Sequence, residues 1–207
     1  MRVELQEPDC RELVLDTRGL IIESVLAGGA AAAHSLDAAR GSLGCALRVA
    51  LPAGLGLGDQ AEVCVHFATS PDSTACQFLE PAQTAGGRHP FLFTQCQAIH
   101  ARSLVPLQDT PGAKITWTAS VAVPEPLTAL MSAASLAAPP PGAPPAPPPA
   151  PGQTLYYFEQ PLPVAPYLIA LAVGALESRP IGPRSSVWRA LRPAVVLPCG
   201  DLRAPGL

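Results

Sequence analysis

A regular alternation of apolar and polar residues runs from Ile115 to Val123 and constrains the fold more than any other feature of the chain. The odd positions carry Ile, Trp, Ala and Val, whereas the even positions carry mostly Thr and Ser. Because successive side chains of a β-strand point to opposite faces, this pattern predicts a strand with one dry face and one polar face. Such strands are typical of antiparallel sheets that cover a core on one side. A second run, Ala61 to Ala68, repeats the signal less cleanly.

Further short segments have the composition of strands and are separated by clusters of turn-forming residues. They are Glu12–Asp16, Leu20–Leu26, Leu43–Leu51, Phe91–Thr94, Leu155–Gln160 and Tyr167–Val173. Helical patterning is weak, and only Glu125–Leu136 and the turn at Pro81–Thr84 are candidates for a short helix. The sequence therefore predicts an all-β fold, an antiparallel β-sandwich or saddle, rather than a βαβ arrangement.

The charge pattern excludes one class of partner. The 207 residues include 13 basic residues, 12 Arg and the single Lys114, and the net charge is −3. The basic residues are scattered, so no positive stripe is available for a nucleic-acid backbone, and we expect no nucleic-acid partner. With 48% hydrophobic residues, the chain has enough apolar material for a core and is not disordered throughout.

Membrane and secretion signals are also missing from the sequence. The longest apolar run, Ala165–Leu176, contains Pro166 and is shorter than the roughly 20 residues that a membrane-spanning helix needs. The first residues are charged, unlike a signal peptide. The six cysteines are dispersed without a CxxC pair. We therefore expect no membrane association, a cytoplasmic location and reduced thiols.

A proline-rich segment interrupts the second half of the chain. Residues 137–152 read AAPPPGAPPAPPPAPG. Proline donates no hydrogen bond to a sheet, so the segment should form extended polyproline II in a long loop thrust into solvent. One interpretation is a ligand for SH3 or WW domains, since PxxP occurs at Pro141–Pro144. No flanking Arg or Lys fixes an orientation for such a ligand, and a plain spacer is the favoured interpretation. Gly28–Ala33 is predicted to be another loop.

Metal ligands and catalytic motifs are not recognisable in the sequence. His34, His66, His89 and His100 lack the spacing that a zinc site needs. There is no GxSxG motif and no phosphate-binding GxGxxG or Walker motif. We therefore assign no catalytic residue and no metal ligand to this chain.

The most unusual segment is HPFLFTQCQAIHARSLVPLQDTP, residues 89–111. Gln95 and Gln97 are two residues apart, which places them on one face of an extended strand, while Cys96 and Ala98 face the other way. Two amides on one face offer both donors and acceptors to a peptide-like ligand. The alternative is that they satisfy neighbouring backbone groups.

Three blocks of the sequence, in order, resemble the aminopeptidase B and leukotriene hydrolase branch of the zinc aminopeptidases. The blocks are ELVLDTRGLIIESV (residues 12–25), the segment from HPFLFTQCQAIHARSLVPLQDTP to TALMSA (89–133), and PYLIALAVGALESRPIGPRSSVW (166–188). The resemblance implies an N-terminal β-saddle domain that packs on a thermolysin-like catalytic domain. In this family the QCQA strand borders the active-site cleft, so Gln95, Gln97 and Ala98 would bind peptide. The glutamine matching Gln97 contacts the substrate near its free amino end.

The family's zinc is held by HExxH and a downstream glutamate, and HExxH is absent from this sequence. The resemblance therefore implies zinc in the full-length family, but none bound by this chain and no peptidase activity of the chain alone. The expected partners are a peptide substrate in the complete enzyme and a catalytic domain, supplied in trans if need be. The alternative is a non-catalytic binding or regulatory fragment, or a truncated isoform.

The resemblance also suggests how the chain is divided. Residues 1–188 are expected to form one β-saddle domain that contains a disordered loop at 137–152. Residues 189–207 no longer resemble the family and are expected to be a divergent, disordered tail. Family members have further strands before the region that matches Leu13, so the sheet is expected to lack strands at its start.

Overall fold

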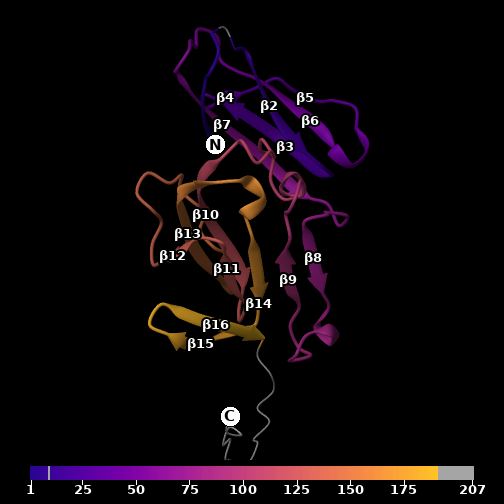
Figure 1. Ribbon diagram of the computed structural model, residues 1–207, viewed down its shortest axis with the longest axis vertical. Coiled ribbons are helices and arrows are strands. Elements are labelled where there is room, and N and C mark those ends of the chain that lie inside the picture. Colours follow the sequence, from indigo (N-terminus) through magenta and orange to yellow (C-terminus); the bar gives the residue numbers. More distant parts are fainter. Residues whose placement is uncertain (9, 191–207) are drawn as a thin grey trace, which may run out of the picture.

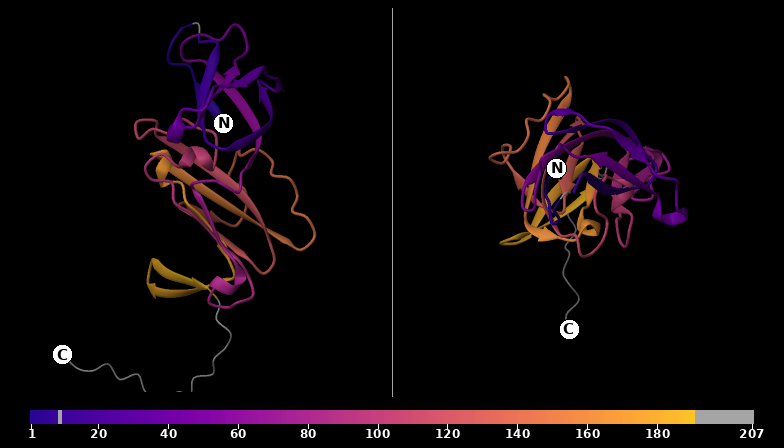
Figure 2. Two further views of the ribbon diagram at one scale, coloured as in Figure 1. Left: turned by 90° about the vertical axis from the view of Figure 1, so that its right-hand side faces the viewer. Right: turned by 90° about the horizontal axis from the view of Figure 1, so that it is seen from above.

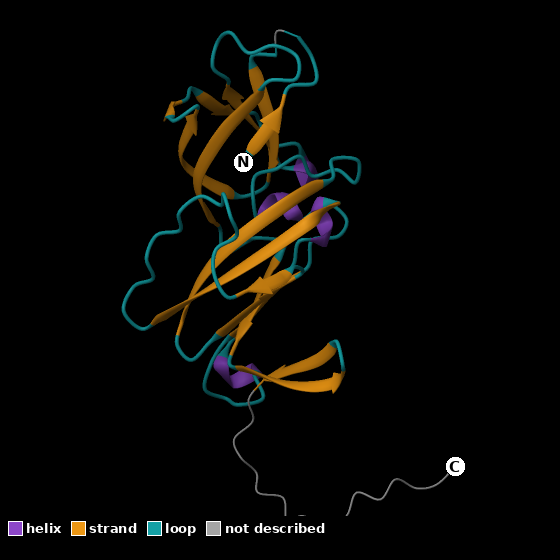
Figure 3. Ribbon diagram, turned by 90° about the vertical axis from the view of Figure 1, so that its left-hand side faces the viewer, coloured by secondary structure: helices purple, strands orange, loops and turns teal. Residues whose placement is uncertain are grey.

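The computed structural model describes residues 1–8 and 10–190 and confirms an all-β fold built from antiparallel sheets (Figure 1). Two lobes are stacked along the long axis, and a two-stranded ribbon lies below them. In the described part of the chain, helix is limited to four short 3-10 turns between strands (Figure 3). Among the described residues, no helix is long and apolar enough to cross a membrane.

The upper lobe is a sandwich of two sheets with strand orders β1-β7-β3-β4 and β2-β6-β5. Its inner faces bury Leu15, Leu47, Val49 and Val63, because these residues alternate with less buried ones along their strands. The elements are β1 (Arg2–Glu4), β2 (Glu12–Thr17), β3 (Leu20–Ala27), β4 (Ala30–Ala31), β5 (His34–Leu36), η1 (Gly41–Leu43), β6 (Cys45–Ala50) and β7 (Gln60–Thr69).

The lower lobe pairs a sheet of order β10-β13-β12 with a sheet of order β11-β14-β9-β8. Val123, Ala129, Phe158 and Val173 meet between them and form its core. The elements are β8 (Cys76–Leu79), η2 (Pro81–Gln83), β9 (Phe91–Thr94), η3 (Ala101–Ser103), β10 (Ile115–Pro124), β11 (Thr128–Met131), β12 (Ala134–Leu136), β13 (Gln153–Val164), η4 (Pro166–Leu168) and β14 (Leu171–Gly174).

The ribbon consists of β15 (Leu176–Gly182) and β16 (Ser185–Ala190), which among residues 1–8 and 10–190 pair only with each other. Its side chains Ile181, Val187 and Trp188 are exposed. Arg189 and Ala190, which were expected in the divergent tail, belong to β16, and residues 191–207 lie outside the described part of the chain. The domain limit at residue 188 stays a prediction.

Most of the expected strands are present. The alternating run from Ile115 falls on β10, and its odd positions are more buried than its even ones. Phe91–Thr94 matches β9 from end to end. Two candidates are too long: Leu43–Leu51 includes the end of η1 before β6, and Tyr167–Val173 includes most of η4 before β14.

The prediction of a short helix within Glu125–Leu136 is wrong. This stretch forms β11 and β12 instead. Ala, Leu and Met favour helices in isolation, but here Ala129 pairs with Val173 and Leu136 pairs with Tyr157. Tertiary pairing therefore overrides local propensity. The turn at Pro81–Thr84 does contain the expected short helix, as the single turn η2.

Candidate functional site

The two predicted glutamines lie in a surface segment, residues 95–100, which we call the glutamine loop. β9 ends at Thr94, where its pairing with β8 also ends, and η3 begins at Ala101. The prediction of one extended strand carrying both glutamines on one face is therefore wrong. The loop nevertheless exposes all three predicted residues, Gln95, Gln97 and Ala98.

Cys96 anchors the glutamine loop in a small core cluster of its own. It is 2% exposed and belongs to a cluster with Ala75, Ala101, Leu107 and Ile169. Burial, together with the negative charge of Asp109, raises the pKa of the Cys96 thiol to about 11. The thiol is therefore protonated near neutral pH and is no nucleophile.

The backbone turns after Gln97, and this explains why Ala98 does not share the buried face of Cys96. The His100 N–H donates to the carbonyl oxygen of Cys96 at 2.9 Å, which closes the turn. The peptide bond between Gln97 and Ala98 is cis. Because the hydrogen-bonded turn ends the extended backbone, Ala98 is exposed, whereas a continued strand would have placed it on the same face as buried Cys96.

The side chains of Gln95 and Gln97 have different surroundings. The Gln97 backbone N–H donates to Oε1 of Gln95 at 2.8 Å, and Nε2 of Gln95 donates to the Gln97 carbonyl oxygen at 3.4 Å. Gln95 thus satisfies neighbouring backbone, which was the alternative interpretation of both glutamines. Within the described residues, no hydrogen bond involves the side-chain amide of Gln97. Its donors and acceptor are available to a ligand.

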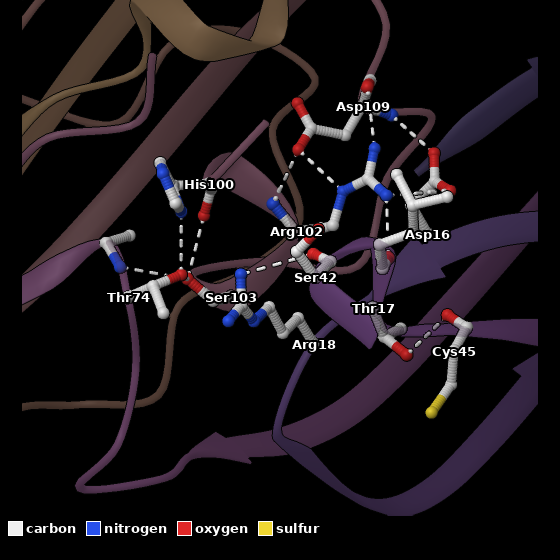
Figure 4. A network of polar contacts seen from close by, with 12 residues as sticks. Asp16, Thr17, Arg18, Ser42, Cys45, Thr74, His100, Arg102, Ser103 and Asp109 are labelled. Atoms are coloured by element: carbon white, nitrogen blue, oxygen red, sulfur yellow. Dashed lines mark hydrogen bonds and ion pairs between the residues drawn. The ribbon is translucent and has the colours of Figure 1, made fainter. Parts of the chain in front are cut away.

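A buried ionic network follows the glutamine loop (Figure 4). Nε of Arg102 donates to Oδ2 of Asp109 at 2.9 Å, and the two side chains are only 7% and 1% exposed. Nη2 of Arg102 donates to the carbonyl oxygen of Asp109 at 2.9 Å, and Nη1 lies 3.5 Å from Oδ1 of Asp16. The guanidinium is therefore held on several sides.

The same network ties the loop to the upper lobe. Nη1 of Arg102 donates to the Leu43 carbonyl oxygen at 2.7 Å, and the Arg18 N–H donates to the Arg102 carbonyl oxygen at 2.9 Å. Asp16 closes the connection, since its Oδ2 accepts the Asp109 N–H at 2.9 Å. The residue after Leu43 must be glycine, because a side-chain carbon on Gly44 would lie 2.1 Å from the Thr17 carbonyl oxygen. The glutamine loop thus rests on a junction that involves both lobes.

A cluster of hydroxyl groups supports the other side of the loop (Figure 4). Nδ1 of His100 and Oγ1 of Thr74 are 2.8 Å apart, and Oγ1 of Thr74 is 3.1 Å from Oγ of Ser103. The Ser103 hydroxyl donates to the His100 carbonyl oxygen at 2.8 Å and accepts the Ala75 N–H at 2.9 Å. Ser103 is completely buried, so this serine and histidine form a structural cluster and no nucleophilic pair.

Zinc, which the resemblance implies for the family, finds no suitable ligands in the described part of the chain. No group of three or more His, Cys, Asp or Glu residues converges there. Cys64 and His66 are neighbours on β7, with Sγ and Nε2 at 3.6 Å, but two groups do not make a zinc site. Five cysteines are free thiols, in agreement with the expectation, and Cys199 lies outside the described residues.

The network residues Asp16, Arg102 and Asp109 were not found by the sequence analysis. Arg102 and Asp109 are seven positions apart, but Asp16 and Asp109 are separated by 93. A weak signal does exist, because an Arg and an Asp flank the apolar run Leu104–Leu107 in a chain that is only 14% charged. Nothing in the sequence links that signal to Asp16.

Comparison with known families assigns the fold. The profile of the Peptidase M1 N-terminal domain matches residues 1–168. The chain therefore belongs to the M1 peptidases, as their N-terminal domain, and the all-β saddle and the resemblance found in the sequence are confirmed.

Two curated relatives illustrate the similarity. Leukotriene A-4 hydrolase of Xenopus laevis is 42% identical over 176 residues, covering 85% of this chain and 28% of the relative. Leucine aminopeptidase 2 of Aspergillus oryzae is 40% identical over 177 residues, with the same two coverages. The chain thus spans less than a third of the length of these relatives.

Solved structures of leukotriene A4 hydrolase agree with this family assignment. Native leukotriene A4 hydrolase of Saccharomyces cerevisiae superposes with a TM-score of 0.72 at 35% identity, covering 90% of this chain and 26% of that enzyme. The yeast enzyme in complex with bestatin superposes with a TM-score of 0.68 at 33% identity, covering 86% and 25%. The N-terminal parts of these enzymes have the same arrangement of sheets.

Proposed function

We propose that this chain provides one wall of the peptide-binding cleft of an M1 zinc aminopeptidase, with the glutamine loop at the rim of the cleft. The observation that carries the proposal is the exposed Gln97 amide, which has no partner among the described residues and lies on a loop anchored by buried Cys96. Peptide binding by Gln97 and Ala98 follows from the resemblance. Gln95 has a different role, since its side chain shapes the loop.

The chemistry of a peptide amino end suits this amide. A free α-ammonium group needs acceptors, and Oε1 of Gln97 is one. A loop backbone that is already held in place loses little conformational entropy on binding, and the Arg102–Asp109 network holds the segment that follows the glutamine loop. Zinc and the general base would come from a catalytic domain, because HExxH is absent from the sequence.

The exposed ribbon offers a surface for that catalytic domain. A two-stranded hairpin is at best marginally stable in water on its own. Within the part of the chain that the structure describes, β15 and β16 pair only with each other, and they expose Ile181, Val187 and Trp188. Contact with a catalytic domain, in the same chain or in trans, would bury these side chains. A cytoplasmic location is part of the proposal and is supported by the free thiols.

Domain grafting tests the proposal. Residues 1–190 of this chain would replace the matching region of Xenopus laevis leukotriene A-4 hydrolase, and peptidase kinetics would be measured with and without Gln97→Ala. We expect the graft to hydrolyse aminoacyl reporters. Gln97→Ala should raise KM about tenfold, because losing a hydrogen bond to a charged group costs about 1.5 kcal/mol.

The control is Gln60→Ala, which removes an exposed glutamine from the upper lobe and should leave KM unchanged. An active graft whose KM is insensitive to Gln97→Ala would show that the glutamine loop does not bind substrate. The full chain alone, assayed with zinc and an arginyl reporter, should show no turnover. Turnover by the pure chain would show that the reacting groups lie within it.

A further inference from the structure

The half-buried ring of His100 has one nitrogen inside the hydroxyl cluster and one outside it (Figure 4). Nδ1 lies 2.8 Å from Oγ1 of Thr74, whereas no hydrogen bond involves Nε2 within the described residues. His100 is the last residue of the glutamine loop, and η3, which follows it, lies where the upper lobe meets the lower lobe (Figure 2). Whether Nε2 carries a hydrogen therefore bears on what this loop can bind.

The contacts of the cluster fix its proton positions, because a serine or threonine hydroxyl has only one proton to donate. Ser103 donates its proton to the His100 carbonyl oxygen at 2.8 Å. The 3.1 Å contact between Oγ of Ser103 and Oγ1 of Thr74 must then use the proton of Thr74. Ser103 can accept it, since only the Ala75 N–H, at 2.9 Å, takes its other lone pair. Thr74 thus has no proton left for His100.

The contact between Thr74 and His100 takes its proton from the ring. Oγ1 of Thr74 accepts, so Nδ1 carries a hydrogen. A neutral imidazole carries only one ring hydrogen, which leaves Nε2 with a lone pair. The two ring nitrogens point away from each other, so this lone pair is directed away from the hydroxyl cluster. The neutral ring therefore presents an acceptor on its outer side.

Free acceptors are few in the glutamine loop. No acidic residue occurs between Thr94 and Asp109. Oε1 of Gln95 is occupied, because it accepts the Gln97 backbone N–H at 2.8 Å. Oε1 of Gln97 and Nε2 of His100 are the side-chain acceptors that remain in this loop among the described residues. A peptide α-ammonium group offers three N–H donors, so two neutral acceptors on one loop suit it.

From these contacts we propose that His100 is a second substrate-binding residue of the glutamine loop. The hydroxyl cluster holds its ring as the Nδ1–H tautomer, and Nε2 accepts a hydrogen bond from the amino end of the peptide. The identity of the ligand rests on the proposed function, whereas the tautomer does not. Because the bond to Thr74 already orients the ring, binding costs little conformational entropy.

Nuclear magnetic resonance of the ring nitrogens tests the tautomer. The purified full chain would carry isotope-labelled histidine and be measured at a pH where the rings are neutral. The protonated and unprotonated nitrogens of a neutral ring give well-separated signals, and loss of signals in His100→Asn identifies those of His100. We expect the hydrogen on Nδ1. A hydrogen on Nε2 would overturn the proposal, whatever the chain binds.

Kinetics of the domain graft test the ligand. His100→Asn is the informative change, because the asparagine amide can replace Nδ1 and donate to Thr74 but offers nothing at the place of Nε2. We expect it to lower kcat/KM for an aminoacyl reporter about tenfold, chiefly through KM. His34→Asn is the matched control, since Nδ1 of His34 likewise donates to a carbonyl oxygen, that of Ala32 at 3.2 Å in the upper lobe. Its kcat/KM should equal that of the unchanged graft.

The outcomes separate this proposal from the function proposed for the loop. If Gln97→Ala raises KM while His100→Asn leaves kcat/KM unchanged, the loop binds peptide but His100 only supports it, and the proposal fails. If neither variant has an effect, both proposals fail. A thermal melt shows whether His100→Asn is folded. A measurement without substitution completes the test: adding L-leucinamide, which has a free α-ammonium group, should shift the Nε2 signal of His100 in the labelled graft. An unmoved signal would overturn the proposal.

Discussion

Phe158→Ala is expected to destabilise the protein by about 3–5 kcal/mol, since removing a buried aromatic side chain forfeits its burial and leaves a cavity. Phe158 is 1% exposed and is among the largest fully buried side chains of the described residues. It lies on β13 in the core of the lower lobe, with Val123, Ala129 and Val173. Because these neighbours belong to three other strands in two sheets, the cavity cannot close by the movement of one strand. Urea unfolding followed by circular dichroism measures the loss.

Phe78→Ala is the matched control. Phe78 is 62% exposed on β8, so the same chemical change there should alter the free energy of unfolding by no more than about 0.5 kcal/mol. Equal losses for the two variants would show that the two sheets of the lower lobe do not enclose a core around Phe158.

The sequence predicted the strands that carry their own period-two pattern. β10 matches its alternating run, because its apolar positions face the core and its hydroxyl-bearing positions face outward. Such a pattern depends only on neighbours in the chain. β12 and β5, with three residues each, are too short to show a period, and β16 has no buried face that would require one.

The placement of the proline-rich loop was also beyond local reasoning. Its composition correctly excluded a strand, but the hollow of about 290 Å³ that the loop forms with Thr118, Ser120 and Leu155 depends on side chains that are distant in the sequence. Glu125–Leu136 shows the opposite failure. There the local composition favoured a helix, but pairing with the distant strands β14 and β13 makes the stretch form strands.

The QCQA motif predicted where the candidate site lies in the sequence, but it did not predict the shape of the site. The motif could not show that β9 ends at Thr94 or that Gln95 binds the Gln97 backbone. Gln97 is therefore distinguished from Gln95 only by the folded structure. The support beneath the loop was equally hidden, because it joins residues from the first strand of one sheet, β2, to the segment after η3.

Asp109→Asn is expected to destabilise the protein by about 3 kcal/mol, since removing one partner of a buried ion pair leaves the other charge uncompensated. The Arg102 side chain is 7% exposed, and its guanidinium would keep only neutral carbonyl oxygens and the more distant Asp16 carboxylate. Asparagine has nearly the volume of aspartate, so the loss reports charge rather than a cavity. In a domain of this size it should lower the melting temperature by about 6–12 °C. Asp37→Asn, in the solvent-accessible pair with Arg48, is the matched control and should melt like the unchanged chain.

The same variant tests whether the network supports the glutamine loop. The carbonyl oxygen of Arg102 holds Arg18 of the upper lobe, and the His100 N–H closes the loop onto Cys96. If the network holds the loop in place, Asp109→Asn will accelerate amide hydrogen exchange at residues 97–103 more than in the strands of the upper-lobe core. A uniform increase across the chain would mean that the ion pair contributes only to global stability. Exchange that rises at the loop while β6 and β7 stay protected would show that Arg102 and Asp109 position Gln97 from beneath.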